Sequence, residues 1–248
     1  MKKVFVFFLL IFISCDSEDA PDCFQTSGDL IKKEIEVEDF ERILVMPNIQ
    51  LLLKQGEDRM VEAETGSNLI NEISTVIEGN RLVVRNTNNC DLFRNSNTAK
   101  ITVTTPVLTE VRSASQLEVL SEGILRFPSL KLISEDFNED NNGNTNGIFR
   151  LTVENNDVRV VGNNITSFFL KGKTDNLQIE LASGTGRFDG SELAAKRVTI
   201  KHRGTNKMIV NPIESLKGEI RSTGDLISVT KPPIVDVKEL FTGKLIFK

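Results

Sequence analysis

The C-terminal half of the chain repeats a short strand-and-turn unit, with SGTGRF at 183–188, RGTNKM at 203–208, STGDLI at 222–227 and FTGKLI at 241–246. The glycines at the third or second place of these segments recur at nearly equal intervals along the chain. A second set of strand-like segments recurs with them: VTI at 198–200, LKGEI at 216–220 and VDV at 235–237. Such a regular period in a chain of strands and turns is typical of a β-solenoid, in which each turn buries one face on its neighbours.

Antiparallel hairpins are the alternative explanation of such a period. Two observations favour the solenoid: glycine returns to one corner, and no helices are available to connect parallel strands in a layered fold. We therefore expect an all-β fold, a right-handed parallel β-helix with turns of about 20 residues. Its corners should be Gly184, Gly204, Gly224 and Gly243, and a valine at Gly204 should disturb folding if φ there is positive. The predicted interior residues are Val198, Ile200, Ile209, Ile220 and Leu245.

The rest of the chain also has the period of strands. Apolar residues alternate with polar ones in short runs, such as RLVV at 81–84, FRLTV at 149–153 and NLQI at 176–179. Asn, Gly, Asp and Ser separate these runs, as they do in turns. A helix near 68–75 is less consistent with the pattern than a strand that ends in a hairpin turn at 78–81.

The N-terminus has the layout of a secretory signal peptide. Lys2 and Lys3 precede an apolar run at 4–13, which is too short to span a bilayer as a helix, and an acidic stretch follows Cys15. The segment FISC at 12–15 resembles a bacterial lipoprotein cleavage box, although Phe12 stands where leucine is usual. We predict lipidation of Cys15 and attachment to the cell envelope, at the outer membrane, with the periplasmic or surface side left open. A signal peptide cut elsewhere and an uncleaved anchor are the alternatives.

These segments predict the domain organisation. Residues 1–14 are the signal peptide, 15–28 a lipidated acidic linker, and 29–248 one β-solenoid domain. Within that domain, 29–110 supply N-terminal strands and 111–248 the repeating turns.

The two remaining cysteines favour a structural disulfide. Cys23 and Cys90 lie beyond the inner membrane if the signal peptide is correct, and disulfides persist there. In the chain-entropy model a bond closing so long a loop stabilises by roughly 4 kcal/mol. Two free thiols or a metal pair are the alternatives.

Composition excludes several classes of partner. The net charge is −5, and it becomes −7 once Lys2 and Lys3 are removed with the signal peptide. An acidic chain without a basic run is a poor match for nucleic acid. The chain has no Trp and no Tyr, so it lacks the usual aromatic platforms for sugars. No cofactor is predicted.

The order of motifs along the chain resembles a known family. The motifs are FERI at 40–43, NLI at 68–70, GNRLVV at 79–84 and AKITVTTPVL at 99–108, followed by the serial glycine turns. Together they resemble the head GIN domain family (DUF2807) of auto-transporter adhesins, from about residue 37 to the end. The resemblance implies a β-helical protein that is secreted or lipid-anchored, and it implies no catalytic residues. The segment 134–147 departs from the pattern.

Three groups of polar residues are candidate sites. Between Asp136 and Gly147, acidic and Asn residues alternate as at the start of a calcium loop, but the required Gly and Glu positions are not matched, so a solvated loop is the simpler explanation. His202, the single histidine, is in phase with Val198 and Ile200, which indicates a strand-end residue. The acidic pairs could serve as glycosidase carboxylates, although residues two apart on a strand more often form its solvated side. These pairs are Glu36, Glu38 and Asp39 in one segment and Glu62 and Glu64 in another.

The sequence therefore predicts a lipid-anchored envelope protein that binds, adheres or scaffolds without catalysis. Its partners would be the membrane, through the lipid, and an envelope or extracellular polymer or protein. The alternative is a carbohydrate-active enzyme, a polysaccharide lyase or hydrolase on a β-helix. A groove with several converging acids and bases would favour the enzyme, and a smooth face the binding protein.

Overall fold

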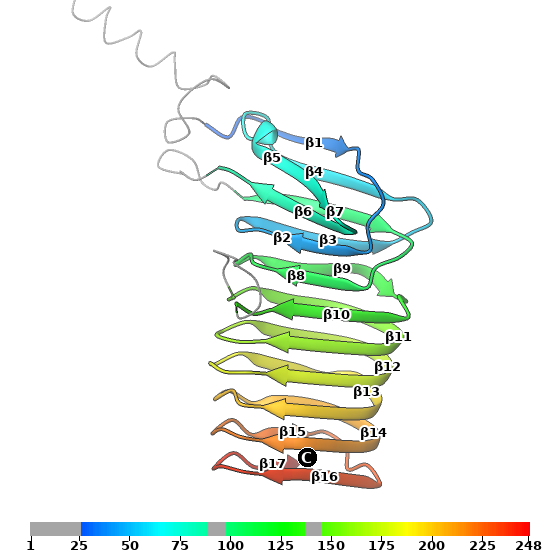
Figure 1. Ribbon diagram of the computed structural model, residues 1–248, viewed down its shortest axis with the longest axis vertical. Helices are drawn as coiled ribbons and strands as arrows, with labels where there is room; N and C mark the ends of the chain where they lie inside the picture. The colour runs from blue at the N-terminus through cyan, green and yellow to red at the C-terminus, as the bar shows by residue number, and fades with distance from the viewer. Residues whose placement is uncertain (1–25, 89–97, 137–144) are drawn as a thin grey trace, which may run out of the picture.

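The computed structural model describes residues 26–88, 98–136 and 145–248, and their regular structure is almost entirely β-strand (Figure 1). The strands of the first half are β1 (Leu30–Ile35), β2 (Arg42–Val45), β3 (Ile49–Gln55), β4 (Met60–Gly66), β5 (Ile73–Glu78), β6 (Arg81–Asn86), β7 (Ala99–Thr105), β8 (Glu110–Ser113), β9 (Glu118–Leu125) and β10 (Ser129–Ser134). Those of the second half are β11 (Ile148–Gly162), β12 (Ser167–Leu181), β13 (Arg187–His202), β14 (Met208–Ile220), β15 (Leu226–Ser228), β16 (Ile234–Glu239) and β17 (Leu245–Phe247). One short 3-10 turn, η3 (Ile70–Glu72), precedes β5. The all-β prediction is confirmed.

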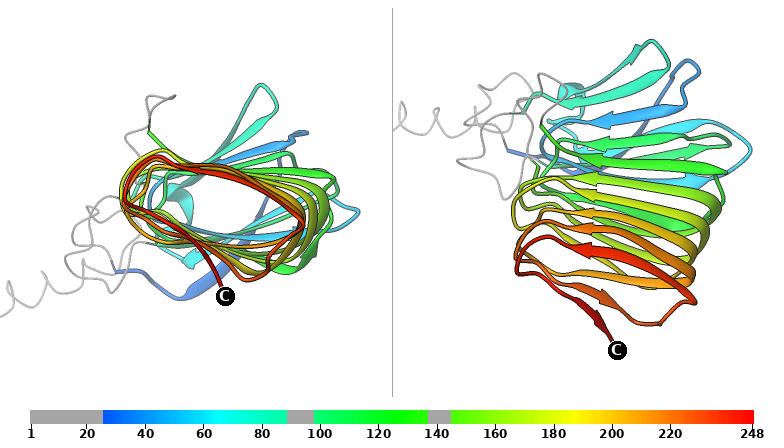
Figure 2. Two further views of the ribbon diagram at one scale, coloured as in Figure 1. Left: turned by 90° about the horizontal axis from the view of Figure 1, so that it is seen from below. Right: turned by 60° about the horizontal axis from the view of Figure 1, so that its bottom comes forward.

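Successive turns of the second half lie on one another through parallel pairing. β11 pairs with β12, β12 with β13, and β13 with β14, and the paired residues occupy equivalent places in successive repeats, as Phe149, Phe168 and Phe188 illustrate. β14 then pairs with both β15 and β16, and β15 pairs with β17. Seen along the stack, the turns superimpose as a flattened ring with two broad faces (Figure 2). The predicted parallel pairing of the repeats is therefore observed.

The core is a set of apolar columns that run through the stack. Phe149, Phe168 and Phe188 are each fully buried, and the first two rings stack with centroids 4.8 Å apart. Because parallel register places equivalent residues one above another, each turn covers the apolar side chains of the turn before it.

Four of the five predicted interior residues face this core. Val198, Ile200 and Ile220 are at most 1% exposed, and Leu245 is partly buried against the core. Ile209 is a correction: it is buried, but it is aligned with Asp189 on the outer side, whereas its neighbours Met208 and Val210 belong to the core. Shifting a strand by one residue exchanges the residues on its two faces. The alternation of apolar and polar residues around Ile209 does not show which of these residues face the core.

The first half combines parallel turns with an antiparallel end. β2 pairs in parallel with β6 and β8, and β3 with β7 and β9. β4 pairs in antiparallel fashion with β1 and β7, and β5 with β6. The β5–β6 hairpin turns at Gly79, whose φ is 66°, as the sequence predicted.

The glycine repeat follows one corner of the stack. Thr205 N donates to Gly184 O at 2.8 Å, Gly224 N to Gly204 O at 3.2 Å, and Gly243 N to Ser222 O at 3.0 Å. The predicted succession of glycine corners is therefore correct.

Candidate binding surface

One broad face of the stack carries aligned charged side chains, because strand residues alternate between the core and solvent. We call this the outer charged face. It consists of Lys131, Arg159, Gln178, Thr199 and Lys217 in one row and of Glu180, Lys201 and Glu219 in the next.

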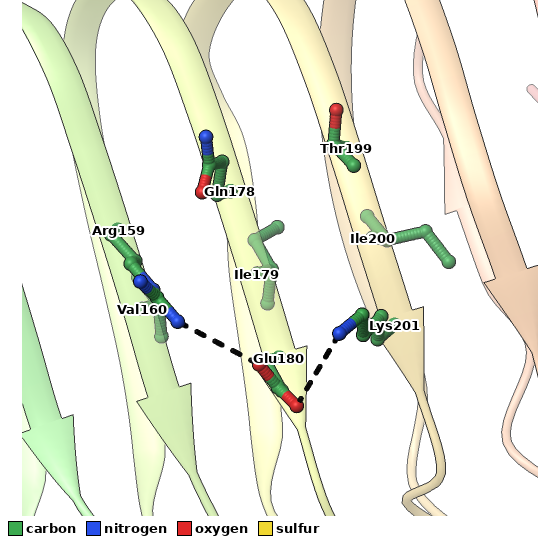
Figure 3. Close-up of a pocket in the computed structure, with 8 residues that line it drawn as sticks. All are labelled: Arg159, Val160, Gln178, Ile179, Glu180, Thr199, Ile200 and Lys201. Carbon is green, nitrogen blue, oxygen red and sulfur yellow. Dashed lines mark ion pairs between the residues drawn. The ribbon is translucent and has the colours of Figure 1, made fainter.

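Glu180 lies between two cations on this face (Figure 3). Its carboxylate is 4.0 Å from Arg159 Nη2 and 3.9 Å from Lys201 Nζ, each on an adjacent turn. All three side chains are exposed by more than a third, so these ion pairs add little to stability. Along this row the charge alternates from one turn to the next, with Glu180, Lys201 and Glu219 in succession.

A groove runs along the upper part of the face. One section, of about 340 Å³, is lined by Arg112, Lys131, Ile133, Glu135, Arg159, Val161, Glu180 and Ala182. A shallower hollow of about 130 Å³ shares Arg159 and Glu180 with it and continues to Lys201. The combined lining has more basic than acidic side chains, and they stand above an apolar floor.

A buried ion pair closes one end of the groove. Arg112 Nη2 is 3.0 Å from Glu135 Oε1, and Arg112 Nη1 donates to the backbone oxygen of Glu135 at 3.2 Å. The two side chains are 7% and 2% exposed. A two-point contact of this kind holds the guanidinium in one orientation, so this end of the groove is preorganised.

Glu219 belongs to the same face one turn further on. A hydrogen bond from Arg221 lowers the pKa of Glu219 below its ordinary value, and the same contact raises the pKa of Arg221. This end of the face therefore carries a carboxylate that is ionised at neutral pH.

The groove suits a negatively charged group. Guanidinium and ammonium groups bind carboxylate, sulfate or phosphate through charge-assisted hydrogen bonds, and arginine does so with two parallel donors. Arg159 and Lys201 are exposed, whereas the acid Glu135 is buried against Arg112. Exposed cations therefore outnumber exposed carboxylates in the groove, where Glu180 is the exposed acid and Lys131, Arg159 and Lys201 are the exposed bases.

Several predicted site residues lie outside the described residues. Cys15, Cys23 and Cys90 are among them, so lipidation and the disulfide stay predictions. In residues 26–88, 98–136 and 145–248, no helix has the length and apolar character needed to cross a membrane.

The segment from Asp136 to Gly147, which begins like a calcium loop and which we expect to be solvated, is described only at its ends. Asp136 accepts hydrogen bonds from the side-chain amides of Asn163 and Asn164, the second at 3.1 Å. Residues 137–144 lie outside the described residues. Nowhere in the described part of the chain do three or more His, Cys, Asp or Glu side chains gather as a metal ion would require.

The acidic pair of β4 has cationic neighbours on the sheet surface. Lys32 Nζ is 2.8 Å from Glu62 and 3.7 Å from Glu64, and Lys100 Nζ is 3.4 Å from Glu64. Glu36, Glu38 and Asp39 follow β1 in a connecting segment. The two acidic groups thus have the surroundings of solvated surface residues.

His202 is the last residue of β13, as predicted, and it faces inward with no exposed surface. Burial lowers the pKa of His202, and the Asn206 backbone and the Asp225 carboxylate oppose this only in part. The imidazole is therefore held in its neutral form inside the stack.

The outer charged face is not among the predicted sites, although the sequence carries a signal of it. Arg159, Glu180 and Lys201 are evenly spaced along the chain, at an interval close to the period of the glycines. The same period applied to charged residues would have aligned Glu180 with Lys201, whereas Arg159 is aligned with Gln178 and lies in the neighbouring row. The buried ion pair of Arg112 with Glu135 gives no such signal in the sequence, because it depends on how the two side chains are oriented.

Together the stacked turns and the charged face define an all-β repeat protein with an extended exposed surface. The chain belongs to the family described as "Putative auto-transporter adhesin, head GIN domain" (DUF2807), whose sequence model matches residues 39–232. No curated protein matches the sequence.

Solved structures share the fold at low sequence identity. A "putative adhesin" from Bacteroides fragilis is 18% identical with a TM-score of 0.79, covering 90% of this chain and 99% of that chain. A "putative adhesin" from Parabacteroides merdae is 19% identical with a TM-score of 0.60, covering 89% and 97%. A "putative lipid binding protein" from Parabacteroides distasonis is 13% identical with a TM-score of 0.61, also covering 89% and 97%.

Proposed function

We propose that the protein is a lipid-anchored protein of the cell envelope that binds an anionic polymer through the outer charged face and has no catalytic role. The observation that carries this proposal is the groove, in which Arg159, Lys201 and Lys131 surround an apolar floor. The family description as adhesins supports a binding role. The stacked turns would act as the scaffold, which we propose to be a right-handed parallel β-helix.

Enzymatic cleavage of a polysaccharide is the second candidate. The convergence of Glu180 with Arg159 and Lys201 favours it, because lyases and hydrolases need acids and bases in one groove. Against it, each groove carboxylate contacts a cation: Glu180 as above, and Glu135 in its buried pair with Arg112. A base that is paired in this way is poorly placed to accept a proton from a substrate.

Removal of the exposed cations should weaken polymer binding. We expect Arg159→Ala with Lys201→Ala to lower the affinity of the purified protein for polygalacturonate by about a hundredfold, because each of the two lost charge-assisted contacts contributes about 1.4 kcal/mol, or a factor of about ten. Binding is measured by calorimetry at two salt concentrations, since an electrostatic contact weakens with salt. Product release from the same polymer tests the enzyme alternative: ultraviolet absorbance detects the unsaturated ends that a lyase leaves, and a reducing-end assay detects the ends that a hydrolase leaves.

The matched control is Lys171→Ala with Lys196→Ala, which removes two ion-paired lysines away from this groove. This variant should bind as the unmodified protein does. Equal losses in both variants, or equal binding of neutral dextran, would contradict the proposal. Binding to phosphatidylglycerol vesicles in preference to polygalacturonate would identify a lipid headgroup as the ligand instead.

Lipid attachment at Cys15 has its own test. Cys15→Ala should move the protein from the detergent phase to the aqueous phase and block lipoprotein-specific cleavage, because the acyl chains supply the membrane affinity. Phase partitioning of cell extracts measures the change. Normal processing and unchanged partitioning of the variant would show that the anchor lies elsewhere.

A further inference from the structure

The last turn of the stack has a covered side and an open side. β16 pairs only with β14, and β17 only with β15, within the part of the chain that the structure describes. Figure 1 shows this turn at the end of the molecule opposite β1. Its outer edges present backbone N–H and C=O groups, which is the arrangement to which another strand can be added.

Apolar side chains are concentrated at this open side. Val235 is aligned with Leu216 of the preceding turn, yet it is 38% exposed where Leu216 is fully buried. The difference arises because the turn of β16 covers Leu216, whereas no turn among residues 26–88, 98–136 and 145–248 covers Val235. Large exposed apolar residues of this turn are Ile234, Val235, Leu240, Phe241, Ile246 and Phe247. A patch of this kind marks an interaction surface.

The charges of β16 are complementary to those of a second copy of the same strand. Asp236 and Lys238 are aligned with Lys217 and Glu219, so both point outward. If a second β16 pairs in antiparallel fashion about a two-fold axis at Val237, Asp236 of each copy lies opposite Lys238 of the other. Opposite charges directly across an antiparallel pair are stabilising, and the symmetry supplies the contact twice.

β17 is compatible with the same axis. It lies on the other broad face of the last turn, and its three residues are all apolar (Figure 2). An axis that crosses the turn from face to face therefore reverses both strands and pairs each with its own copy. A continuous filament is less consistent with the structure, because the opposite end carries the antiparallel strands β1, β4 and β5.

We propose that the protein forms a tail-to-tail dimer, in which β16 and β17 of two copies pair across a two-fold axis. The two β1 ends then point away from each other. The groove lined by Arg112, Lys131 and Arg159 lies on earlier turns, although Asp236 and Lys238 extend the two rows of the outer charged face by one turn.

A charge-reversal cycle tests the proposal on the purified full chain carrying Cys15→Ala. Asp236→Lys and Lys238→Asp should each raise the dimer dissociation constant by about tenfold or more, since each places two like-charge pairs at the interface. The double variant carrying both changes should return the constant to within about threefold of the original. Sedimentation velocity over a range of concentrations measures the constant.

Matched controls come from the preceding turn. Lys217→Asp and Glu219→Lys alter the same two rows one turn earlier, away from the open edge, and should leave dimerisation unchanged. Ile246→Lys should prevent dimerisation with no change in circular dichroism. A monomer at all concentrations, or a dimer that neither single reversal weakens, would overturn the proposal, and so would a failure of the double variant to recover.

Discussion

Gly184→Ala is expected to destabilise the protein by more than about 3 kcal/mol. Gly184 has a φ of 84°, where an L-residue costs about 1–2 kcal/mol. The added Cβ would also lie 2.2 Å from the backbone oxygen of Asn164, which accepts a hydrogen bond from Thr185 N. The Asn164 oxygen and the Thr185 nitrogen both belong to the backbone. Neither can move away from the added Cβ without opening the corner between two turns. Urea denaturation followed by circular dichroism measures the change.

Gly204→Ala is the matched control one turn further along the same corner. Gly204 is outside the left-handed region, and its added Cβ would meet nothing nearer than His202 Cε1 at 3.4 Å, an ordinary contact. We expect its stability to be unchanged, or raised by up to about 1 kcal/mol through the reduced freedom of the unfolded chain. If both variants lose the same stability, backbone conformation is not the reason why glycine occupies this corner.

The stability of the protein is expected to fall as the pH is lowered below about 6.5, because of His202. Burial holds the pKa of this imidazole below its ordinary value of 6.5, so the unfolded chain binds a proton that the folded chain does not. A depressed histidine pKa means that full stability is present above pH 6.5 and is lost as the pH falls towards the folded pKa. The loss is about 1.4 kcal/mol for each pH unit in that window. Urea denaturation at pH 7.5, 6.5, 5.5 and 5.0 measures it.

His202→Leu separates this contribution from that of the carboxylates. The residues aligned with His202 on the adjacent turns are Leu181 and Ile220, both buried, so leucine suits the column. The variant should keep its stability between pH 7.5 and 5.0. Carboxylates with lowered pKa values, such as Glu154 and Asp175, destabilise only at more acidic pH, because they lose their charge there. Parallel pH profiles for the two proteins would refute the role of His202.

The sequence period predicted the stacking of turns because glycine and apolar residues must return to the same place in every turn. Val198, Ile200 and Ile220 could be placed in the core for that reason. Ile209 could not be, because one shifted residue exchanges the faces of a strand. The condition for an effect at Gly204, a positive φ, is not met. Gly184 and Gly204 are equivalent in sequence, and only the backbone torsion shows that Gly184 alone of these two requires glycine.

The groove was less accessible to sequence analysis than the core. Its cations come from turns that the period relates, but its buried end depends on how Arg112 and Glu135 are oriented. The sequence alternation places charged residues on the outer side of a strand without showing which of them converge. Cys23 and Cys90 illustrate the opposite case, in which the sequence suggests a bond that the described residues do not include.

The direction of the backbone hydrogen bonds has a mechanical consequence. The bonds between β11, β12, β13 and β14 run along the long axis of the molecule, so each ladder joins one turn to the next (Figure 1). A pull along that axis would stretch all the bonds of a ladder at once, and the load would be shared among them. A pull on a free chain end would instead peel away one turn at a time. The force needed to rupture the molecule should therefore be higher for a pull spread along the long axis than for a pull on one chain end.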